Sequence, residues 1–350
     1  MSNRDDLIAV LEGGKPPRIP LAIYEDFINP QPDDPAWGPL LARGLTPINW
    51  PSGVHHIMEG DIERTVSAEV WQGYPAQRET LRTPVGAIMQ LSAQGWTQEY
   101  WLKAPADYRV MEYVVRHTRL EPALDLYERA EARFGDRGIS LVYAGRSPMQ
   151  VILVDYAGLE HLAHHLSEGF PELFALAEAL LDQLIETCRL IAAGPGPYVS
   201  LLENLTAETW GPRRYALYHL PVYEKVLPIL HAAGKKVYVH YDGKLACLKD
   251  LVAQTAIDGI ESLTTAPEGD LTYAEARAAW PEKVFWANIN VSRYLRPPAE
   301  LRAEVRELAR QGAPDGRRFL FEISEDLPAN WRESIPVVLD ALAEMEGAAT

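Results

Sequence analysis

Residues 223–243, YEKVLPILHAAGKKVYVHYDG, contain one complete helix-to-strand unit and end in residues that can carry chemistry. The apolar residues of the first half recur at helical spacing: Val226, Leu227, Leu230 and Ala233. Gly234 ends the predicted helix, and residues 236–240 are typical of a short buried strand. Because side chains alternate along a strand, His240 and Asp242 are expected on the same side. The stretch therefore predicts an imidazole and a carboxylate converging at the carboxyl end of a strand, which would form half of a metal site.

The same helix-to-strand unit recurs along most of the chain. Helices are predicted at 121–134, 171–192, 213–233, 245–255, 272–279, 299–310 and 331–345. Strands are predicted at 19–23, within 64–71, and at 139–143, 198–202, 236–240, 259–263, 284–287 and 319–323. Eight strands that alternate with helices are the pattern of an α/β protein with a closed (β/α)8 TIM barrel. A doubly wound open sheet is the alternative.

The N-terminal third departs from this regular alternation. Residues 27–63 are rich in Pro, Gly and Trp and are predicted to be mostly loop, with a short helix near 37–42. Residues 64–113 alternate polar and β-branched side chains between Gly and Pro, so they predict a β-rich elaboration, part of which covers the mouth of the barrel. No low-complexity linker divides the chain, and we expect a single domain over residues 1–350.

Composition and charge limit the possible partners. A chain of 350 residues with 47% hydrophobic residues can bury a large core, and no window approaches the length of an apolar membrane span. The N-terminal residues lack the pattern of a signal peptide, so we expect a cytoplasmic protein that does not bind a membrane. A net charge of −16 argues against nucleic acid as a partner, since its phosphates require clustered Lys and Arg.

Polar residues follow several of the predicted strands, where a barrel places its active site. These residues are Tyr24, Glu25, Glu203, Asn204, His240, Asp242, Glu261, Asn288, Glu325 and Asp326. Acids and amides at such positions also form turns and cap the next helix, and this explanation suits Asn204 and Asp326 best. His240 with Asp242 fits a site and a turn about equally well.

A competing histidine cluster lies in the predicted helical region around residue 160. His161 and His165 are four residues apart and could in principle bind zinc. The apolar residues around them define a different face of the helix, so we expect both histidines to face solvent. The chain also lacks the glycine-rich nucleotide-binding motifs and the G-x-S-x-G motif, which disfavours nucleotide-dependent and serine-hydrolase mechanisms.

Several segments resemble the uroporphyrinogen decarboxylase superfamily. They are RDDLIAVLEGGKPPRIPL (4–21), LLENLTAETWGPRRYALYHLPVYEKVLPILHAAGKKVYVHYDG (201–243), IESLTTAPEGDLTYAEARAAW (260–280), FWANIN (285–290) and FLFEISEDLPANW (319–331). The superfamily has a (β/α)8 fold and includes cofactor-free decarboxylases and zinc-dependent corrinoid methyltransferases. The arginine-rich N-terminal segment and the F-S-D-I motif of the decarboxylases are absent here, so the chain is more similar to the methyltransferase branch.

The resemblance to this branch implies a metal site with altered ligands. Its members hold zinc with a His-x-Cys pair, often a Glu on a later strand, and a distant Cys. His240 matches the histidine, Asp242 stands at the first cysteine, Glu261 lies near the glutamate, and Glu325 stands at the second cysteine. Carboxylates in place of thiolates would still bind Zn²⁺, with less selectivity against other divalent ions. Alternatively, the metal has been lost and the acids act as general acid or base.

The resemblance also implies an activity and its partners. A methyltransferase of this branch moves a methyl group from a small methylated substrate, such as a methyl ether, to the cobalt of a corrinoid on a separate protein. Metal would activate the atom that bears the methyl group. Glu203 and Tyr24 are expected to act on the substrate, and Asn204 and Asn288 to bind it. The alternatives are a decarboxylase or other lyase acting on a small carboxylic acid, which would need basic groups such as Arg18 or Arg293, and a non-catalytic ligand-binding barrel.

Overall fold

The computed structural model describes residues 2–346, which form two compact units. The first unit comprises the chain up to Gly53, residues Leu124–Tyr143, and the chain from Pro195 onward. The second comprises Val54–Ala123 and Ala144–Gly194. Within the described residues, no helix has the length and apolar character needed to cross a bilayer.

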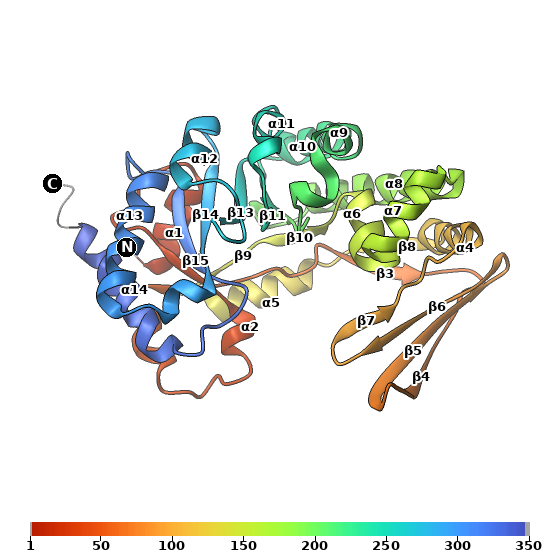
Figure 1. The fold of residues 1–350 in the computed structure, drawn as a ribbon, viewed down its shortest axis with the longest axis horizontal. Coiled ribbons are helices and arrows are strands. Elements are labelled where there is room, and N and C mark those ends of the chain that lie inside the picture. The colour runs from red at the N-terminus through yellow and green to blue at the C-terminus, as the bar shows by residue number, and fades with distance from the viewer. Residues whose placement is uncertain (1, 347–350) are drawn as a thin grey trace. The chain divides into compact units, whose positions relative to one another are not determined.

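The first unit is built on a parallel sheet that returns on itself (Figure 1). Its hydrogen-bonded order is β10 (Val142–Gly145), β11 (Tyr198–Leu201), β12 (Lys236–His240), β13 (Gly259–Thr264), β14 (Val284–Ile289), β15 (Phe319–Ile323), β1 (Leu21–Tyr24), β2 (Leu45–Asn49) and β9 (Ile139–Ser140). Only Leu141 separates β9 from β10, so the two ends of the sheet are segments of one strand. Counting β9 and β10 as one strand gives a sheet of eight strands. The predicted (β/α)8 barrel is therefore confirmed.

The predicted second strand was placed in the wrong segment. We predicted it within residues 64–71, but the strand beside β1 is β2, in a region predicted to be mostly loop. Its sequence LTPIN has little strand character, since Pro47 lacks the N–H donor of a regular ladder residue. Pairing with β1, where Ile23 is the register partner of Pro47, establishes this strand in spite of its weak local propensity.

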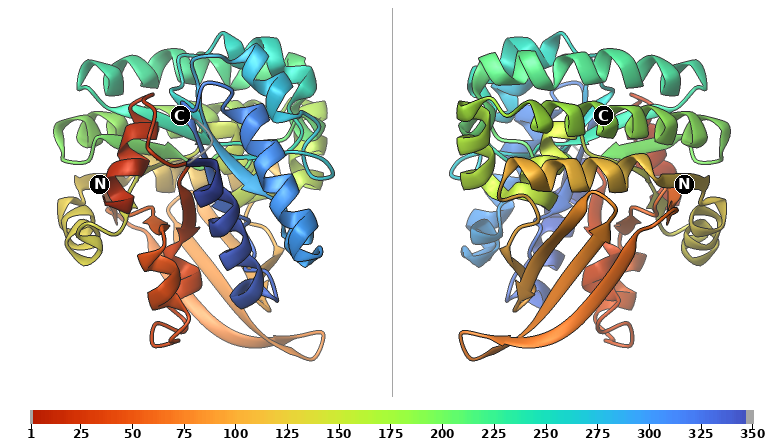
Figure 2. Two further views of the ribbon diagram at one scale, coloured as in Figure 1. Left: turned by 90° about the vertical axis from the view of Figure 1, so that its left-hand side faces the viewer. Right: turned by 90° about the vertical axis from the view of Figure 1, so that its right-hand side faces the viewer.

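Helices follow the barrel strands largely as predicted. They are α1 (Asn3–Leu11), α2 (Glu25–Ile28), α3 (Trp37–Ala42), α5 (Leu124–Phe134), α9 (Ala207–Tyr218), α10 (Leu220–Ala232), α11 (Lys249–Ala253), α12 (Tyr273–Ala279), α13 (Pro298–Gly312) and α14 (Trp331–Glu346). The predicted helix 213–233 is two helices that meet at His219, and Figure 2 shows α13 and α14 packed as neighbours. α1 begins with a capping box at Ser2 and Asp5, which satisfies the first backbone N–H groups of the helix.

The interior of the barrel changes from apolar to polar along the strands. Near their amino ends the buried residues are large and apolar, and they pack against Leu7, Val10 and Leu11 of α1. They include Ala22, Tyr198, Tyr238, Trp286 and Leu320. Because side chains two positions apart share a face, the next inward residues are polar: Tyr24, Ser200, His240, Asn288 and Glu322. We call this second set, together with Glu261, the lumen layer.

The second unit contains the predicted β-rich elaboration. Its four antiparallel strands are β4 (Glu63–Trp71), β5 (Tyr74–Thr83), β6 (Gly86–Ala93) and β7 (Trp96–Glu99). A two-stranded sheet pairs β3 (Val54–Met58) with β8 (Thr118–Pro122). The helical elements are α4 (Pro105–Arg116), α6 (Pro148–Val151), η1 (Ile152–Ala157), α7 (Gly158–Glu168) and α8 (Pro171–Ala193). That part of this elaboration covers the barrel mouth stays a prediction.

One side chain in this unit is placed differently from the prediction. His165 does not face solvent: it is 1% exposed, and its Nδ1 lies 2.8 Å from the hydroxyl of Tyr108. Burial lowers the pKa of His165, which favours the neutral imidazole. The buried hydroxyl of Tyr108 gives this histidine a structural partner that the helical pattern alone could not show.

Candidate functional site

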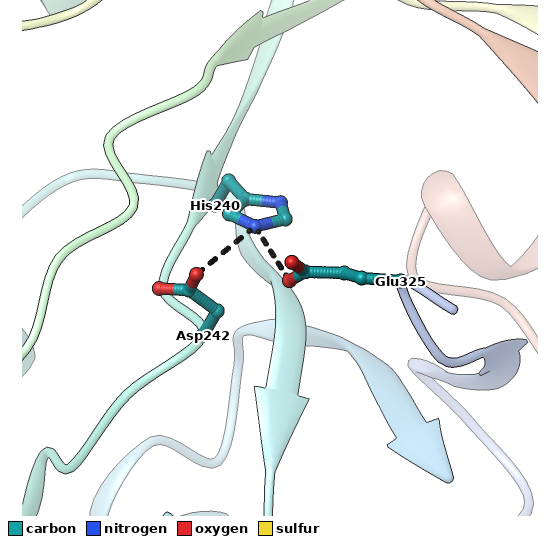
Figure 3. A group of neighbouring side chains, drawn as sticks. All are labelled: His240, Asp242 and Glu325. Atoms are coloured by element: carbon teal, nitrogen blue, oxygen red, sulfur yellow. Dashed lines mark hydrogen bonds and ion pairs between the residues drawn. The ribbon is translucent and has the colours of Figure 1, made fainter. Parts of the chain in front are cut away.

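Three predicted metal ligands come together at the carboxyl ends of the barrel strands (Figure 3). His240 is the last residue of β12, Asp242 follows two residues later, and Glu325 follows β15 by two residues. Their ligand atoms all lie within 4.8 Å of one another. His240 Nε2 is 3.2 Å from Glu325 Oε1 and 3.7 Å from Asp242 Oδ2. One imidazole nitrogen and two carboxylates therefore face a common point, and this donor set suits a divalent metal ion.

Glu261 lies on the other side of the same imidazole. It is fully buried, it is the register partner of His240 in β12 and β13, and its Oε1 is 3.4 Å from His240 Nδ1. A carboxylate at Nδ1 favours a proton on that nitrogen and leaves Nε2 free to bind a metal. Glu261 is thus placed to orient the candidate ligand His240 rather than to complete the three-residue cluster.

Ser262 and Asn288 support Glu325, the third candidate ligand. The Ser262 hydroxyl donates a hydrogen bond to Glu325 Oε1 at 3.2 Å, and Asn288 Nδ2 donates to Ser262 Oγ at 3.2 Å. Ser262 has a φ of +59°, and the register of β13 against β14 shifts between Ile260 and Leu263. Asn288, predicted to bind substrate, is therefore linked to the cluster through Ser262. The sequence analysis missed Ser262, because nothing in its local sequence signals the bulge.

The charges of the cluster are strongly coupled. Burial alone would lower the pKa of His240, but the surrounding carboxylates, Glu261 foremost, hold that pKa well above its ordinary value. Burial also tends to raise the pKa of Asp242, yet its hydrogen bond and charge interaction with His240 keep the pKa below the usual range. Without a metal, His240 is therefore a cation paired with ionised Asp242.

The pKa values of two further residues of the lumen layer are shifted by burial and by these nearby charges. Glu322, on β15, is fully buried, and neither of its carboxylate oxygens makes a well-formed hydrogen bond with the described residues. Burial raises the pKa of Glu322 well above its ordinary value, and the charge of Glu261 adds to the effect. The Tyr24 hydroxyl likewise makes no well-formed hydrogen bond with the described residues, and burial, followed by the charge of Glu322, raises the pKa of Tyr24. Glu322 was not among the predicted site residues. In the sequence it is a single acid within an apolar strand, and the prediction considered the residues that follow the strands.

Asn204 is a neighbour of the cluster. Its Nδ2 donates a hydrogen bond of 3.1 Å to Asp242 Oδ2, and it adopts a left-handed φ of +49°, which asparagine tolerates better than most residues. This bond fixes one oxygen of a candidate ligand. A role for Asn204 in binding substrate stays a prediction.

Glu203 lies in a network of buried tyrosines. Its Oε1 accepts a 3.0 Å hydrogen bond from the Tyr223 hydroxyl, which is 2.7 Å from the hydroxyl of Tyr241. Tyr241 in turn lies 3.0 Å from Tyr215. Since Tyr241 lies between His240 and Asp242 in the chain, this network anchors the backbone that carries both candidate ligands. A catalytic role for Glu203 stays a prediction.

The basic residues expected for a lyase form contacts outside the cluster. Arg18 precedes β1, at the amino end of the strands, where its Nε donates to Asp6 at 2.9 Å. Arg293 donates to Thr265 Oγ1 at 2.9 Å and forms an ion pair with Glu304. Neither placement favours binding of a substrate carboxylate at the cluster.

Comparisons with known proteins agree with the fold. No family model and no curated protein sequence matches the chain. A solved methyltransferase from Methanosarcina mazei is similar over 99% of both chains, with a TM-score of 0.59 and 10% sequence identity. A D-psicose 3-epimerase from Clostridium cellulolyticum H10 covers 65% of this chain and 82% of its own, at 12% identity and a TM-score of only 0.35. The chain therefore shares the overall fold of the methanosarcinal methyltransferase.

Proposed function

We propose that this protein is a metal-dependent methyltransferase that moves a methyl group from a small methylated substrate to a corrinoid carried by a partner protein. One observation carries the proposal: the ligand atoms of His240, Asp242 and Glu325 converge within 4.8 Å at the end of the barrel where such folds place catalysis. The resemblance of the sequence segments to corrinoid methyltransferases supports the reaction class. The shared fold with a methyltransferase is consistent with it.

The residues present fit a divalent metal, with zinc as the first candidate. His240, Asp242 and Glu325 would hold the ion, and the three groups supply one nitrogen and two oxygen donors. When bound, such an ion supplies Lewis acidity toward the heteroatom that bears the methyl group. Three protein ligands are the number typical of catalytic zinc sites, which leave a position for substrate.

The protein's own residues would preorganise this site. Glu261 fixes the ring of His240 from the Nδ1 side, Ser262 holds Glu325 Oε1, and Asn204 holds Asp242 Oδ2. Each candidate ligand therefore has a neighbour that restricts its orientation. Restricting the ligands in advance reduces the conformational entropy lost when metal and substrate bind.

Elemental analysis of protein purified without chelator and supplied with zinc tests the metal site. We expect one equivalent per chain in the wild type and in His231→Ala, and a loss of metal in His240→Ala. His231 is a suitable control because it lies on α10 and contacts Asp258 at 2.9 Å. Methyl transfer to free reduced cobalamin, measured by its absorbance change with candidate methyl donors, tests the reaction. Zinc retained by His240→Ala, or bound below one equivalent by the wild type, would contradict the proposal.

A further inference from the structure

The outer edge of β4 is unpaired in the four-stranded sheet of the second unit. The order of that sheet is β4-β5-β6-β7, so β4 has a neighbouring strand on one side only (Figure 1). Within residues 2–346, no backbone hydrogen bond joins Glu63–Trp71 to any segment other than β5. The N–H and C=O groups along such an edge are a template for a further strand.

β4 lacks the features that usually protect an edge strand from pairing. Its sequence, ERTVSAEVW, contains no Lys, Pro or Gly, and its pairing with β5 is unbroken over all nine residues. Arg64 forms an ion pair with Glu79 of β5, and Glu69 forms one with Arg78 at 2.8 Å. The charges of these two β4 residues are therefore compensated within the sheet and do not repel an approaching strand.

The opposite edge of the same sheet is protected. β7 has only four residues, and its register against β6 shifts between Leu91 and Ser92. Lys103 Nζ also donates a hydrogen bond of 3.3 Å to the backbone oxygen of Met89 on β6. Among the described residues, the sheet therefore has one long and regular edge, so pairing between copies of the chain would end at two copies instead of continuing into a fibre.

The groups that face outward along β4 are apolar side chains and their backbone amides. Residues 72–73 form a two-residue turn between β4 and β5, so the odd-numbered residues of β4 exchange hydrogen bonds with β5. The N–H and C=O groups of the even-numbered residues therefore point outward. On the face that these residues share, Val66 and Val70 are 58% and 73% exposed, with Ala68 between them.

Charge restricts how two copies of β4 can pair with each other. A two-fold axis perpendicular to the sheet places one residue of β4 opposite itself, because residues opposed in an antiparallel pair share a face. An axis at Val66 would place Glu63 opposite Glu69 of the second copy, and an axis at Glu69 would place that acid opposite itself. Like charges opposed in this way are destabilising. An axis at Ser67 would place Arg64 opposite an apolar side chain.

We propose that β4 pairs antiparallel with β4 of a second copy of this chain, on a two-fold axis at Ala68, which joins the two four-stranded sheets into one. In this register Val66 of each copy lies opposite Val70 of the other, and no like charges are opposed. Opposed valines are a stabilising cross-strand pair, and the outward backbone groups of the even-numbered residues exchange hydrogen bonds. The dimer does not depend on the proposed function.

Sedimentation equilibrium of the full chain, at about 1 to 200 µM in about 150 mM salt, tests whether the dimer forms. We expect a reversible monomer–dimer equilibrium with a dissociation constant on the micromolar scale, because an interface built on one strand pair lies at the small end of specific interfaces. A wild type that stays monomeric at about 200 µM would overturn the proposal.

Two double variants test the register. Val66→Lys with Val70→Lys opposes two positive charges and should raise the dissociation constant at least about tenfold. Val66→Lys with Val70→Glu opposes unlike charges and should keep the constant within about threefold of the wild type. The two lysines reduce the net charge of −16 and thus the long-range repulsion between copies, so the loss of the dimer is a local effect. Equal affinities of the two double variants would contradict the register.

Val85→Lys is the matched control, since Val85 is an exposed valine outside β4, and it should leave the dissociation constant unchanged.

Ala68→Pro removes the outward N–H at the axis. Proline is tolerated on an edge strand where its missing N–H would face solvent, so circular dichroism should show a folded monomer. The dissociation constant should again rise at least about tenfold. A dimer that persists unchanged in this variant and in the double-lysine variant would lie on another surface, and the pairing of β4 would be excluded.

Discussion

His240 and Glu261 are register partners on adjacent parallel strands, and the imidazole Nδ1 lies 3.4 Å from the carboxylate Oε1. Their side chains therefore leave the sheet at the same level and on the same face. The carboxylate directs the opposite nitrogen of the ring toward Asp242 and Glu325. In the proposed metal site, this relationship would make Glu261 a positioning residue for His240, which leads to the first prediction.

Glu261→Gln should weaken zinc binding about 10–100-fold, the usual cost of losing a carboxylate that supports a metal-binding histidine. The amide keeps the size of the side chain beside Nδ1 but no longer carries the charge that makes the imidazole a better ligand. Competition against a chromophoric zinc chelator measures the affinity. An affinity equal to that of the wild type would show that Glu261 does not orient His240.

Asp242→Cys should increase the preference of the site for zinc over manganese, because thiolate is a softer ligand than carboxylate. Cobalt-substituted protein should gain a sulfur-to-cobalt charge-transfer band that the wild type lacks. Cys247 provides an internal control, since it is exposed and already present in the wild type. Absence of the band in folded, cobalt-loaded protein would place residue 242 outside the metal coordination shell.

Because of His219, the free energy of unfolding should decrease as the pH is lowered. Burial lowers its pKa to about 3, and its ring packs against Trp210 at 4.8 Å. The unfolded chain takes up a proton near pH 6.5 while the folded chain does not, so stability is retained above that pH and is lost as pH falls. Between pH 7 and pH 5 the loss should be about 2 kcal/mol.

Urea denaturation of the wild type and His219→Phe at both pH values measures this contribution. The variant cannot take up the proton, so its stability should fall by about 2 kcal/mol less than that of the wild type over the same interval. The comparison uses the change in the free energy of unfolding between the two pH values. A loss of stability in the variant that is the same at both pH values therefore does not affect it. Parallel pH dependences would contradict the assignment to His219.

Ser262→Ala and Ser262→Gly should differ in stability by about 1–2 kcal/mol, with the glycine variant the more stable, because residue 262 has a left-handed φ of +59°. Both variants lose the hydrogen bond to Glu325, so both should bind zinc less tightly than the wild type. Thermal unfolding of metal-free protein gives the first quantity and chelator competition the second. Equal stabilities of the two variants would indicate that the backbone at residue 262 relaxes.

The barrel could be predicted because its pattern is local and repeated. Each unit pairs a helix of regular apolar spacing with a short buried strand, and the segment 223–243 shows the unit completely. β2 could not be predicted, since Pro47 and Asn49 weaken its local strand character and its pairing with β1 is a tertiary effect. The tyrosine network around Tyr241 likewise depends on helices that only the fold brings together.

The candidate site was predictable where its residues end strands. His240, Asp242 and Glu325 lie at or just after strand ends, and the resemblance assigned them as ligands before their distances were known. Glu322 and Ser262 were missed for different physical reasons. Glu322 lies inside a buried strand, where a single acid looks like an exception, and the position of Ser262 follows from a change of register that leaves no mark in composition.

The shift of register in β13 between Ile260 and Leu263 has a structural result beyond local strain. In a regular strand, adjacent residues point to opposite faces, so one strand can offer only one of two neighbours to a given site. The left-handed backbone at residue 262 lets β13 present both Glu261 and Ser262 to the cluster, one on each flank of the His240–Glu325 pair. Side chains of β13 thereby contact both His240 at the end of β12 and Glu325 beyond β15, so that β12 and β15, which are not neighbours in the sheet, are linked through β13.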